Sequence, residues 1–343
     1  MPKILTIIIP TYNMQDYLHH CLNSLIVPKQ LRCFLEVLVV NDGSTDSSST
    51  IAHKYEANYP DTFRVIDKQN GNYGSCINKG LEIATGKYIK VLDADDSFNT
   101  KSLEGYLKFL QRVDVDMIIS PFVSVDEHGK ELQRVSYDLP AEQSLTWKQL
   151  TPAFKKRSLQ MHAVTYKTQN IRAINYRQTE GISYTDQEWI FTPLISVNTA
   201  VTFPNVLYKY LIGREGQTVN ADIFKRNIQH NEQCCRRIIR DYKSFLPFDS
   251  YKQEYIDYRF LITLTAMYKW YLVDYRDLDI RQLVGFDDFV RSVDTAYVDL
   301  LDAQCLGYTK YHYIRQWHKN RMEYPTLWPV YRWYAKIMHK VCR

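Results

Sequence analysis

The chain has 343 residues, of which 45 % are hydrophobic and 24 % charged, and this suits one large or two smaller globular domains with a sizeable core. No window reaches the roughly 18 consecutive apolar residues of a membrane span, which favours a cytoplasmic protein. The seven cysteines are scattered and lack C-x-x-C spacing, which argues against a disulfide framework and against a structural zinc site.

The net charge of +5 originates at the end of the chain. Residues 309–343 hold eight Lys or Arg against the single acid Glu323, a surplus of +7 that leaves the other 308 residues at −2. Basic segments rich in aromatic residues can bind nucleic acid. Because the surplus is confined to the tail and no recognition motif accompanies it, no nucleic-acid partner is expected.

Apolar runs alternate with amphipathic helical patterns along the first 120 residues. The runs are residues 4–10 (ILTIIIP), 35–40 (LEVLVV), 63–67 (FRVID), 88–92 (YIKVL) and 115–120 (VDMIIS). Nearly continuous apolar strands are typical of a sheet covered on both faces, and the βαβα order predicts a mostly parallel, doubly wound α/β sheet. Ligands of such sheets bind beyond the carboxyl ends of the strands.

Polar loops follow the first, second and fourth of these expected strands, and another lies at the βα junction after the third. They are residues 10–13 (PTYN), 41–46 (NDGSTD), 70–75 (NGNYGS) and 93–96 (DADD). Each by itself also fits a structural role, because Gly43 and Gly74 allow tight turns and Asp42 and Ser44 can cap a helix. Their convergence on one sheet edge favours a binding site.

The DADD segment is the hardest to explain structurally. Asp93, Asp95 and Asp96 repel one another, and a helix cap needs only one of them. Carboxylate clusters suit Mg²⁺ or Mn²⁺, with substrate phosphates completing the coordination. The segment therefore predicts a cation that holds a diphosphate.

Further candidates follow in the next hundred residues. His162 lies in an expected strand, where a structural histidine is the alternative to a ligand. Asp186 and Glu188 lie at an expected helix start, where a helix cap is the alternative to catalysis. Trp189 fits either a sugar-stacking face or the core. Arg214, between two glycines, fits either a phosphate contact or a solvated turn.

Beyond Val219 long helical periodicities replace the strands, and the chain ends in a basic amphipathic segment. Its apolar face would comprise Val330, Trp333, Tyr334, Ile337, Met338 and Val341. A basic helix with Trp and Tyr is typical of a membrane-surface anchor, and a helix docked on the body is the alternative. The anchor would place the protein at the inner face of the cytoplasmic membrane.

Four stretches together resemble the inverting family 2 glycosyltransferases. They are residues 7–13 (IIIPTYN), 39–46 (VVNDGSTD), 70–96 (NGNYGSCINKGLEIATGKYIKVLDADD) and 184–189 (YTDQEW), within a match over roughly residues 4–215. The resemblance implies an A-type nucleotide-sugar transferase fold in residues 1–218, here followed by a helical region, residues 219–343. Where many members have Ala-Arg-Asn, this chain has Cys76, Ile77 and Asn78, so Lys79 is the nearest cation.

The resemblance also implies roles for individual residues. Contacts to the nucleotide sugar would come from Pro10, Thr11, Tyr12, Asn13, Asp42, Gly43, Ser44, Gly74, Asn78, Lys79, Asp93, Asp96 and Arg214. Asp42 would bind the base, Asp93 would approach the ribose, and Asp96 would support the site or face the donor sugar. Asp95 would bind the metal, with His162 as a further candidate ligand. Asp186 matches the general base, and Glu188 and Trp189 would support it or contact the acceptor.

These features together predict an inverting glycosyltransferase that depends on Mn²⁺ or Mg²⁺. It would move a sugar from a nucleotide-diphosphate donor, with UDP favoured, to a glycan or lipid-linked glycan in surface polysaccharide synthesis. One alternative is a sugar nucleotidyltransferase, which would need a glycine-rich basic loop where this chain has PTYNMQD. The other is a catalytically silent glycan-binding or scaffolding member of the fold, which the intact DADD and TDQEW disfavour.

Overall fold

The computed structural model describes residues 2–214, 221–245, 247–275, 277–307, 310–320 and 322–323, with positions 329–330, 333–334 and 337. Contacts between residues divide the chain into two compact units. One comprises residues 1–218 and 248–255, and the other comprises residues 219–247 and 256–343.

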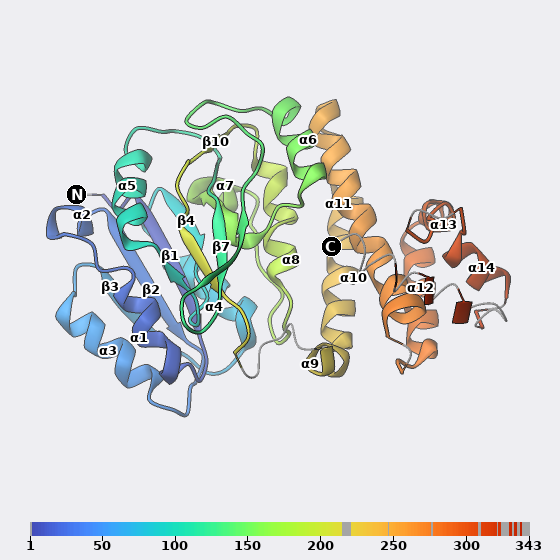
Figure 1. Ribbon diagram of the computed structural model, residues 1–343, viewed down its shortest axis with the longest axis horizontal. Coiled ribbons are helices and arrows are strands. Elements are labelled where there is room, and N and C mark those ends of the chain that lie inside the picture. The colour runs from blue at the N-terminus through green and yellow to red at the C-terminus, as the bar shows by residue number, and fades with distance from the viewer. Residues whose placement is uncertain are drawn as a thin grey trace. The chain divides into compact units, whose positions relative to one another are not determined.

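A seven-stranded sheet forms the centre of the first unit (Figure 1), with the strand order β10-β6-β9-β4-β1-β2-β3. The strands are β1 (Leu5–Thr11), β2 (Leu35–Asn41), β3 (Phe63–Asp67), β4 (Tyr88–Val91), β6 (Met117–Ile119), β9 (Val164–Lys167) and β10 (Ala200–Thr202). Only β9 runs antiparallel to its neighbours, β4 and β6. The mostly parallel α/β sheet expected from the sequence is therefore confirmed.

Helices flank this sheet, which explains why most positions of its central strands are apolar. They are α1 (Gln15–Asn23), α2 (Lys29–Arg32), α3 (Ser48–Asn58), α4 (Asn72–Ile83), α5 (Thr100–Leu110), α6 (Trp147–Lys156), α7 (Thr168–Ala173) and α8 (Asp186–Trp189). All seven residues of β2 are buried, and α4 packs on β1 and β2. Burial on both faces selects Val, Ile and Leu at consecutive positions instead of an alternating pattern.

A second, four-stranded sheet begins directly after the DADD segment. Its order is β5-β11-β7-β8, formed by β5 (Ser97–Phe98), β11 (Tyr208–Leu211), β7 (Phe122–Val125) and β8 (Glu131–Val135). Because β11 pairs with β5 through Tyr208 and Phe98, residues near 210 lie beside the aspartate turn, more than a hundred positions earlier in sequence.

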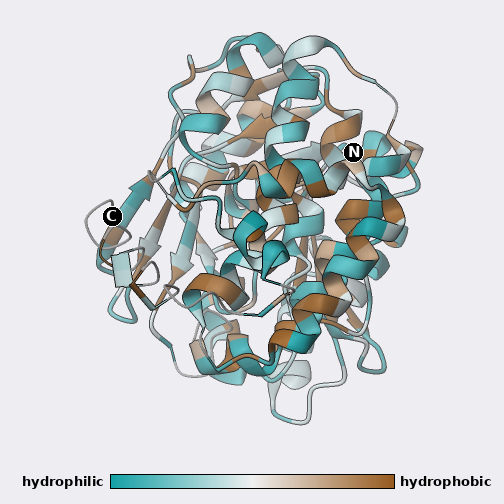
Figure 2. Cartoon of the chain, turned by 90° about the vertical axis from the view of Figure 1, so that its right-hand side faces the viewer, coloured by the Kyte–Doolittle hydropathy of each residue, from teal (hydrophilic) through white to brown (hydrophobic). Residues whose placement is uncertain are grey.

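The second unit is helical, as the change of periodicity after Val219 predicted. Its helices are α9 (Ala221–Arg226), α10 (Ile228–Ser244), the part of α11 (Ser250–Lys269) from residue 256 onward, α12 (Ile280–Val293), α13 (Ala296–Asp302) and α14 (Tyr313–Lys319), and a π-helical turn (Trp270–Asp274) extends α11. Figure 2 shows hydrophobic and hydrophilic residues alternating along the helices. Among the described residues, no helix is both long and apolar enough to cross a bilayer.

A buried ionic cluster ties the helices of this unit together. The Asp287 side chain is fully buried and accepts hydrogen bonds from Tyr268 Oη (2.7 Å), Arg291 Nε (2.6 Å) and His318 Nε2 (2.9 Å). His318 Nδ1 lies 2.7 Å from Asp302 Oδ1. Burial alone would lower the pKa of His318, but its hydrogen bonds to the two carboxylates outweigh burial and raise that pKa.

The raised pKa of His318 predicts a pH-dependent stability of this unit. The protonated imidazole stabilises the fold fully below the unfolded pKa of about 6.5, and this contribution is lost as the pH rises through the higher folded value. His318→Gln is expected to cost about 3 kcal/mol at pH 5.5, the lower end of the cost of breaking a buried ion pair. In thermal denaturation, the difference in stability from wild type should shrink as the pH rises above 6.5 and through the folded pKa.

His53→Gln is the matched control for this prediction. His53 also lies between two carboxylates, those of Glu56 and Asp67, each at 2.8 Å, but its side chain is 47 % exposed. Screening by solvent should limit its cost to about 1 kcal/mol or less. Equal losses of unfolding free energy in His318→Gln and His53→Gln would contradict a special role of the buried cluster.

Candidate active site at the carboxyl edge of the sheet

The loops after β1 and β2 join to form one rim of the site. Asp42 N donates to Thr11 O (2.8 Å), Asn13 N donates to Ser44 Oγ (3.0 Å), and Thr45 N donates to Asn13 Oδ1 (2.9 Å). Parallel neighbours end at the same sheet edge, so these contacts follow directly from the pairing of β1 with β2.

Residues 10–13 differ in what they offer a ligand. Pro10 and Thr11 end β1, and the Thr11 side chain is buried and donates to Ile9 O (3.2 Å). Tyr12 is 48 % exposed, so its ring is open to stacking. Asn13 adopts a positive φ of 51°, which turns the chain toward the loop after β2.

Asp42 lies at the centre of a hydrogen-bond network that the sequence did not indicate. Its Oδ1 accepts from Lys68 Nζ (2.6 Å), Gly71 N (3.0 Å) and Ser75 Oγ (3.4 Å). The carboxylate is only 4 % exposed, and it also forms a hydrogen bond with the Cys76 side chain. Gly43, at φ +73°, follows in a turn where a Cβ would lie 3.2 Å from Asn70 N.

On α4, Gly74 and Asn78 have packing roles. A Cβ on Gly74 would lie 2.0 Å from Thr179 O, so only glycine lets α4 approach this segment. The Asn78 amide donates to Gln178 O and to Glu180 Oε1, both at 2.8 Å. Both Nδ2 hydrogens of Asn78 are therefore used within the protein. Lys79 Nζ pairs with Glu82 on the same helix at 3.1 Å. Contacts of these three residues with the nucleotide sugar remain predictions.

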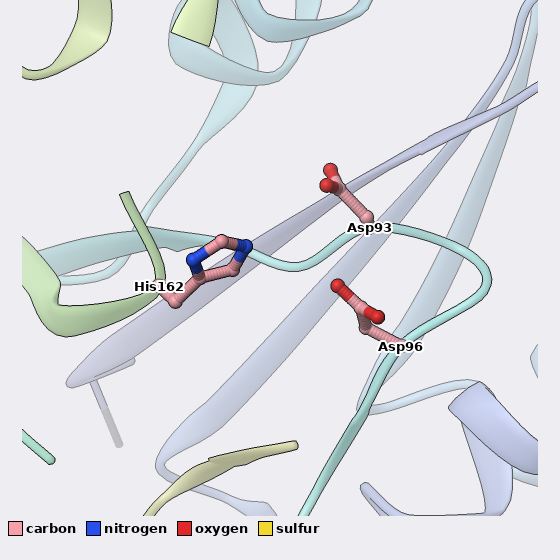
Figure 3. A group of neighbouring side chains, drawn as sticks. All are labelled: Asp93, Asp96 and His162. Carbon is pink, nitrogen blue, oxygen red and sulfur yellow. The ribbon is translucent and has the colours of Figure 1, made fainter. Parts of the chain in front are cut away.

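Asp93 and Asp96 converge with His162 in a group that could hold a metal ion. One potential ligand atom from each lies within 4.8 Å of the others, and in Figure 3 a ring nitrogen of His162 faces the two carboxylates. Burial and then the charge of Asp95 raise the pKa of Asp93 to about 7, and the same two causes raise that of Asp96. A cation would relieve this repulsion by displacing protons.

His162 lies in a short 3-10 turn (Met161–Ala163) that leads into β9, whereas the sequence predicted a strand. Its Nδ1 is buried and has no hydrogen-bond partner within the described residues. Burial, with a contribution from Lys90, lowers its pKa to about 3, so the imidazole is neutral. Neutral imidazole is the form that binds metals, and two carboxylates with one imidazole suit Mn²⁺. These residues therefore fit a divalent cation.

The Asp95 carboxylate has a different partner from the one expected. Its Oδ2 accepts from Arg214 Nε at 2.5 Å, and the two side chains are only 11 % and 14 % exposed. The Arg214 guanidinium also lies 5.4 Å from the centre of the Tyr17 ring. Arg214 therefore reaches the aspartate turn, as the phosphate-contact interpretation requires. In this structure Asp95 is held by an arginine, while Asp93 and Asp96 converge with His162.

Asp186 begins the short helix α8. Its charge contributes to the raised pKa of Asp93 and of Tyr73, so it lies within electrostatic range of the carboxylate cluster. Thr185 makes no side-chain cap to α8, and its Oγ1 accepts from Gln178 Nε2 at 2.8 Å instead. The Thr185 side chain therefore does not cap this helix, and Asp186 and Glu188 lie in its first turn.

Glu188 and Trp189 are both buried, each only 1 % exposed. Glu188 Oε2 accepts from Thr179 N at 2.8 Å and so fixes the segment that also contacts α4. Trp189 packs edge-on against Tyr166 and Tyr176, with ring centres 5.3 and 5.7 Å away. Of the two interpretations of Trp189, the burial of its ring agrees with the core one.

Sequence reasoning missed the residues that surround the cluster. Tyr73 Oη donates to Asp93 Oδ1 (2.8 Å), and Tyr208 Oη donates to Asp96 Oδ2 (2.5 Å). Lys90 in β4 is fully buried and donates to the carbonyls of His162 (2.8 Å) and Val164 (3.0 Å). Of these residues, only Lys90 had a signal in the sequence, because a lysine within an apolar strand is expected to be buried and must then find hydrogen-bond acceptors inside the protein.

A mostly parallel sheet with an aspartate turn beyond β4 is the architecture of the A-type nucleotide-sugar transferases. Residues 6–177 match the family model described as glycosyl transferase family 2, and the chain belongs to this family. Its fold is similar to that of Staphylococcus aureus TarS 1–349, solved in complex with UDP-GlcNAc, with a TM-score of 0.69 and 19 % identity over 94 % of this chain and 93 % of that one.

Two bacterial relatives are similar in sequence over part of their length. The uncharacterized glycosyltransferase YibD of Escherichia coli K12 is 30 % identical over 213 residues, which are 61 % of this chain and 61 % of the relative. The MG025 homolog of Mycoplasma pneumoniae, also an uncharacterized glycosyltransferase, is 38 % identical over 121 residues, 35 % of this chain and 39 % of the relative. The chain thus spans about two fifths to three fifths of these relatives.

Proposed function

We propose that this protein is an inverting, metal-dependent glycosyltransferase that uses a nucleotide-diphosphate sugar. The observation that supports this most is the convergence of Asp93, Asp96 and His162 within 4.8 Å, beside Asp186. One buried and one partly buried carboxylate lie next to a neutral histidine whose Nδ1 has no hydrogen-bond partner among the described residues, and a bound cation would account for this arrangement. A bound divalent cation would neutralise charge that develops on the leaving diphosphate.

The donor would bind across the loops after β1 and β2. The exposed Tyr12 ring can stack on the base, and the Asp42 carboxylate can accept from a base N–H, as uracil would offer. Asn13 and Ser44 would shape the ribose pocket. We favour UDP as the nucleotide, because TarS, which shares this fold, was solved with UDP-GlcNAc. Arg214 would turn from Asp95 to the diphosphate as a charged, bidentate donor.

The acceptor would be a hydroxyl of a glycan or lipid-linked glycan, in synthesis of a bacterial surface polysaccharide. Asp186 would take the hydroxyl proton while the oxygen attacks the anomeric carbon. The bond from that carbon to the diphosphate would break on the opposite face, so the configuration inverts. Asp95 remains a predicted ligand of the cation, available once Arg214 has moved.

A donor screen tests this proposal. We expect purified protein with Mn²⁺ to release nucleotide from a UDP-sugar faster than from GDP- or TDP-sugars, and we expect EDTA to stop the release. Absence of turnover with every donor, combined with absence of metal-dependent nucleotide binding, would overturn the enzyme assignment and favour a glycan-binding member of the fold.

We also propose that the C-terminal segment contacts an anionic membrane surface at the inner face of the cytoplasmic membrane. Val330, Trp333, Tyr334 and Ile337 are all exposed, between 39 and 66 %. Met338 and Val341, the rest of the expected apolar face, lie outside the described residues. Basic residues near such a face add about 1 kcal/mol each on an anionic leaflet.

Deleting the residues after Pro325 is expected to abolish sedimentation with vesicles that contain anionic lipid. The full chain should bind these vesicles and should not bind purely zwitterionic ones, because the attraction is electrostatic. If the truncated and the full chain sedimented equally, the segment would have no membrane role.

A further inference from the structure

Two tyrosines from distant parts of the chain each hold one carboxylate of the Asp93–Asp96–His162 cluster. Tyr73, on α4, donates from Oη to Asp93 Oδ1 at 2.8 Å. Tyr208, on β11, donates from Oη to Asp96 Oδ2 at 2.5 Å. Both hydroxyls are phenolic O–H groups, which donate hydrogen bonds to carboxylates.

Tyr208 touches every member of the cluster. Besides donating to Asp96, its oxygen accepts from the backbone N–H of Asp93 at 3.2 Å. Its ring packs edge-on against the His162 imidazole, with ring centres 4.8 Å apart. The side chain is fully buried, so it has little freedom to move away from these three contacts.

β11 fixes Asp96 through a second contact. Leu211 N donates to Asp96 Oδ1 at 2.7 Å, so both carboxylate oxygens are oriented by one short strand. A carboxylate has about four lone-pair positions, and two of them remain for a cation. Without such donors, two acids within reach of the same ion would repel each other and rotate apart.

We propose that Tyr73 and Tyr208 are positioning residues that preorganise Asp93 and Asp96 for a divalent cation. This inference rests on the proposed metal site. Each phenol donates to one carboxylate oxygen and occupies only one of the lone-pair positions of that carboxylate. Groups that orient metal ligands in this way change metal affinity by about 10–100-fold when they are removed.

Tyr73→Phe and Tyr208→Phe test the proposal in the full chain, with Mn²⁺ as the probe. Each variant should raise the Mn²⁺ dissociation constant by about 10–100-fold in calorimetry or in EPR of free Mn²⁺. In turnover assays the Mn²⁺ concentration for half-maximal rate should rise by the same factor, while kcat at saturating Mn²⁺ should stay within about threefold. The visible spectrum of bound Co²⁺ should change, because it reports ligand geometry.

Tyr106→Phe is the matched control. Tyr106 is fully buried in the same unit, and its hydroxyl also donates one hydrogen bond, to Thr165 Oγ1 at 2.8 Å, away from the aspartate turn. Loss of this bond should lower the melting temperature without changing Mn²⁺ affinity. The control therefore separates a loss of stability from a loss of preorganisation.

The possible results distinguish the positioning role of the tyrosines from the metal site itself. Mn²⁺ binding by wild type with unchanged affinity in both tyrosine variants would overturn the positioning role and leave the metal site intact. Lack of Mn²⁺ and Mg²⁺ binding by wild type would overturn the metal site and the positioning role with it. Should Tyr208→Phe not fold, the less buried Tyr73→Phe decides, because its effect on Asp93 is expected independently.

Discussion

Asp186→Asn is expected to leave donor binding nearly unchanged and to lower the rate of sugar transfer by about 10²–10⁴-fold, the usual contribution of a general base. Asparagine keeps the size of the side chain but cannot accept the acceptor's proton. Asp186 lies at the start of α8, where its charge reaches Asp93 and Tyr73. The measurement is a pair of assays, nucleotide-sugar affinity by calorimetry and transfer to the acceptor under single-turnover conditions.

Asp138→Asn provides the control for this experiment, because it makes the same chemical change at an exposed residue whose partner is Lys156. Transfer by that variant should be unchanged. If Asp186→Asn kept full transfer activity, the base would have to be another group. Glu188 is a poor substitute, since it is buried and its Oε2 accepts from Thr179 N.

Asp95→Asn is expected to abolish metal-dependent donor binding and to reduce kcat/KM by at least about 100-fold, because the site loses one negative charge that a divalent cation requires. The Arg214 guanidinium now holds this carboxylate, as a cation would. Donor affinity measured with and without Mn²⁺ gives the readout: the variant should show no gain from the metal.

Arg214→Gln separates two explanations of that loss. If Asp95 acts only by positioning Arg214, the arginine variant should show the same loss of metal dependence. If Asp95 binds the cation, Arg214→Gln should keep or improve Mn²⁺ affinity. It should weaken only the binding of the nucleotide sugar, because the variant lacks a contact to the diphosphate. Full metal dependence in Asp95→Asn would leave Asp93, Asp96 and His162 as the ligands.

The sheet was predictable because its signal is local. The five apolar runs became β1, β2, β3, β4 and β6, and the polar loops that follow β1, β2 and β4 lie at one edge, as the parallel order requires. The short strands β5, β7, β8 and β11 were not predicted. Their two to five residues form a sheet only by pairing with segments far away in the sequence.

The details of the site were less accessible to sequence reasoning. Asp95 was expected to bind the metal, which stays a prediction, while the convergence of Asp93 and Asp96 on His162 was not foreseen. Adjacent acids differ by where a turn directs each side chain, and composition does not encode that direction. The sequence left two roles for Trp189, acceptor contact and core packing, and its burial in the structure favours core packing.

The sequence by itself determined the parallel α/β sheet, the helical region that follows, and the loops where chemistry is concentrated. These follow from patterns within a few residues, namely hydrophobic period, turn residues and clustered charge. Only the tertiary structure decided that Tyr73 and Tyr208 hold the carboxylates, that Lys68 holds Asp42, and that Arg214 pairs with Asp95. Each of these contacts joins residues 20 to 119 positions apart, so each exists only after the chain has folded.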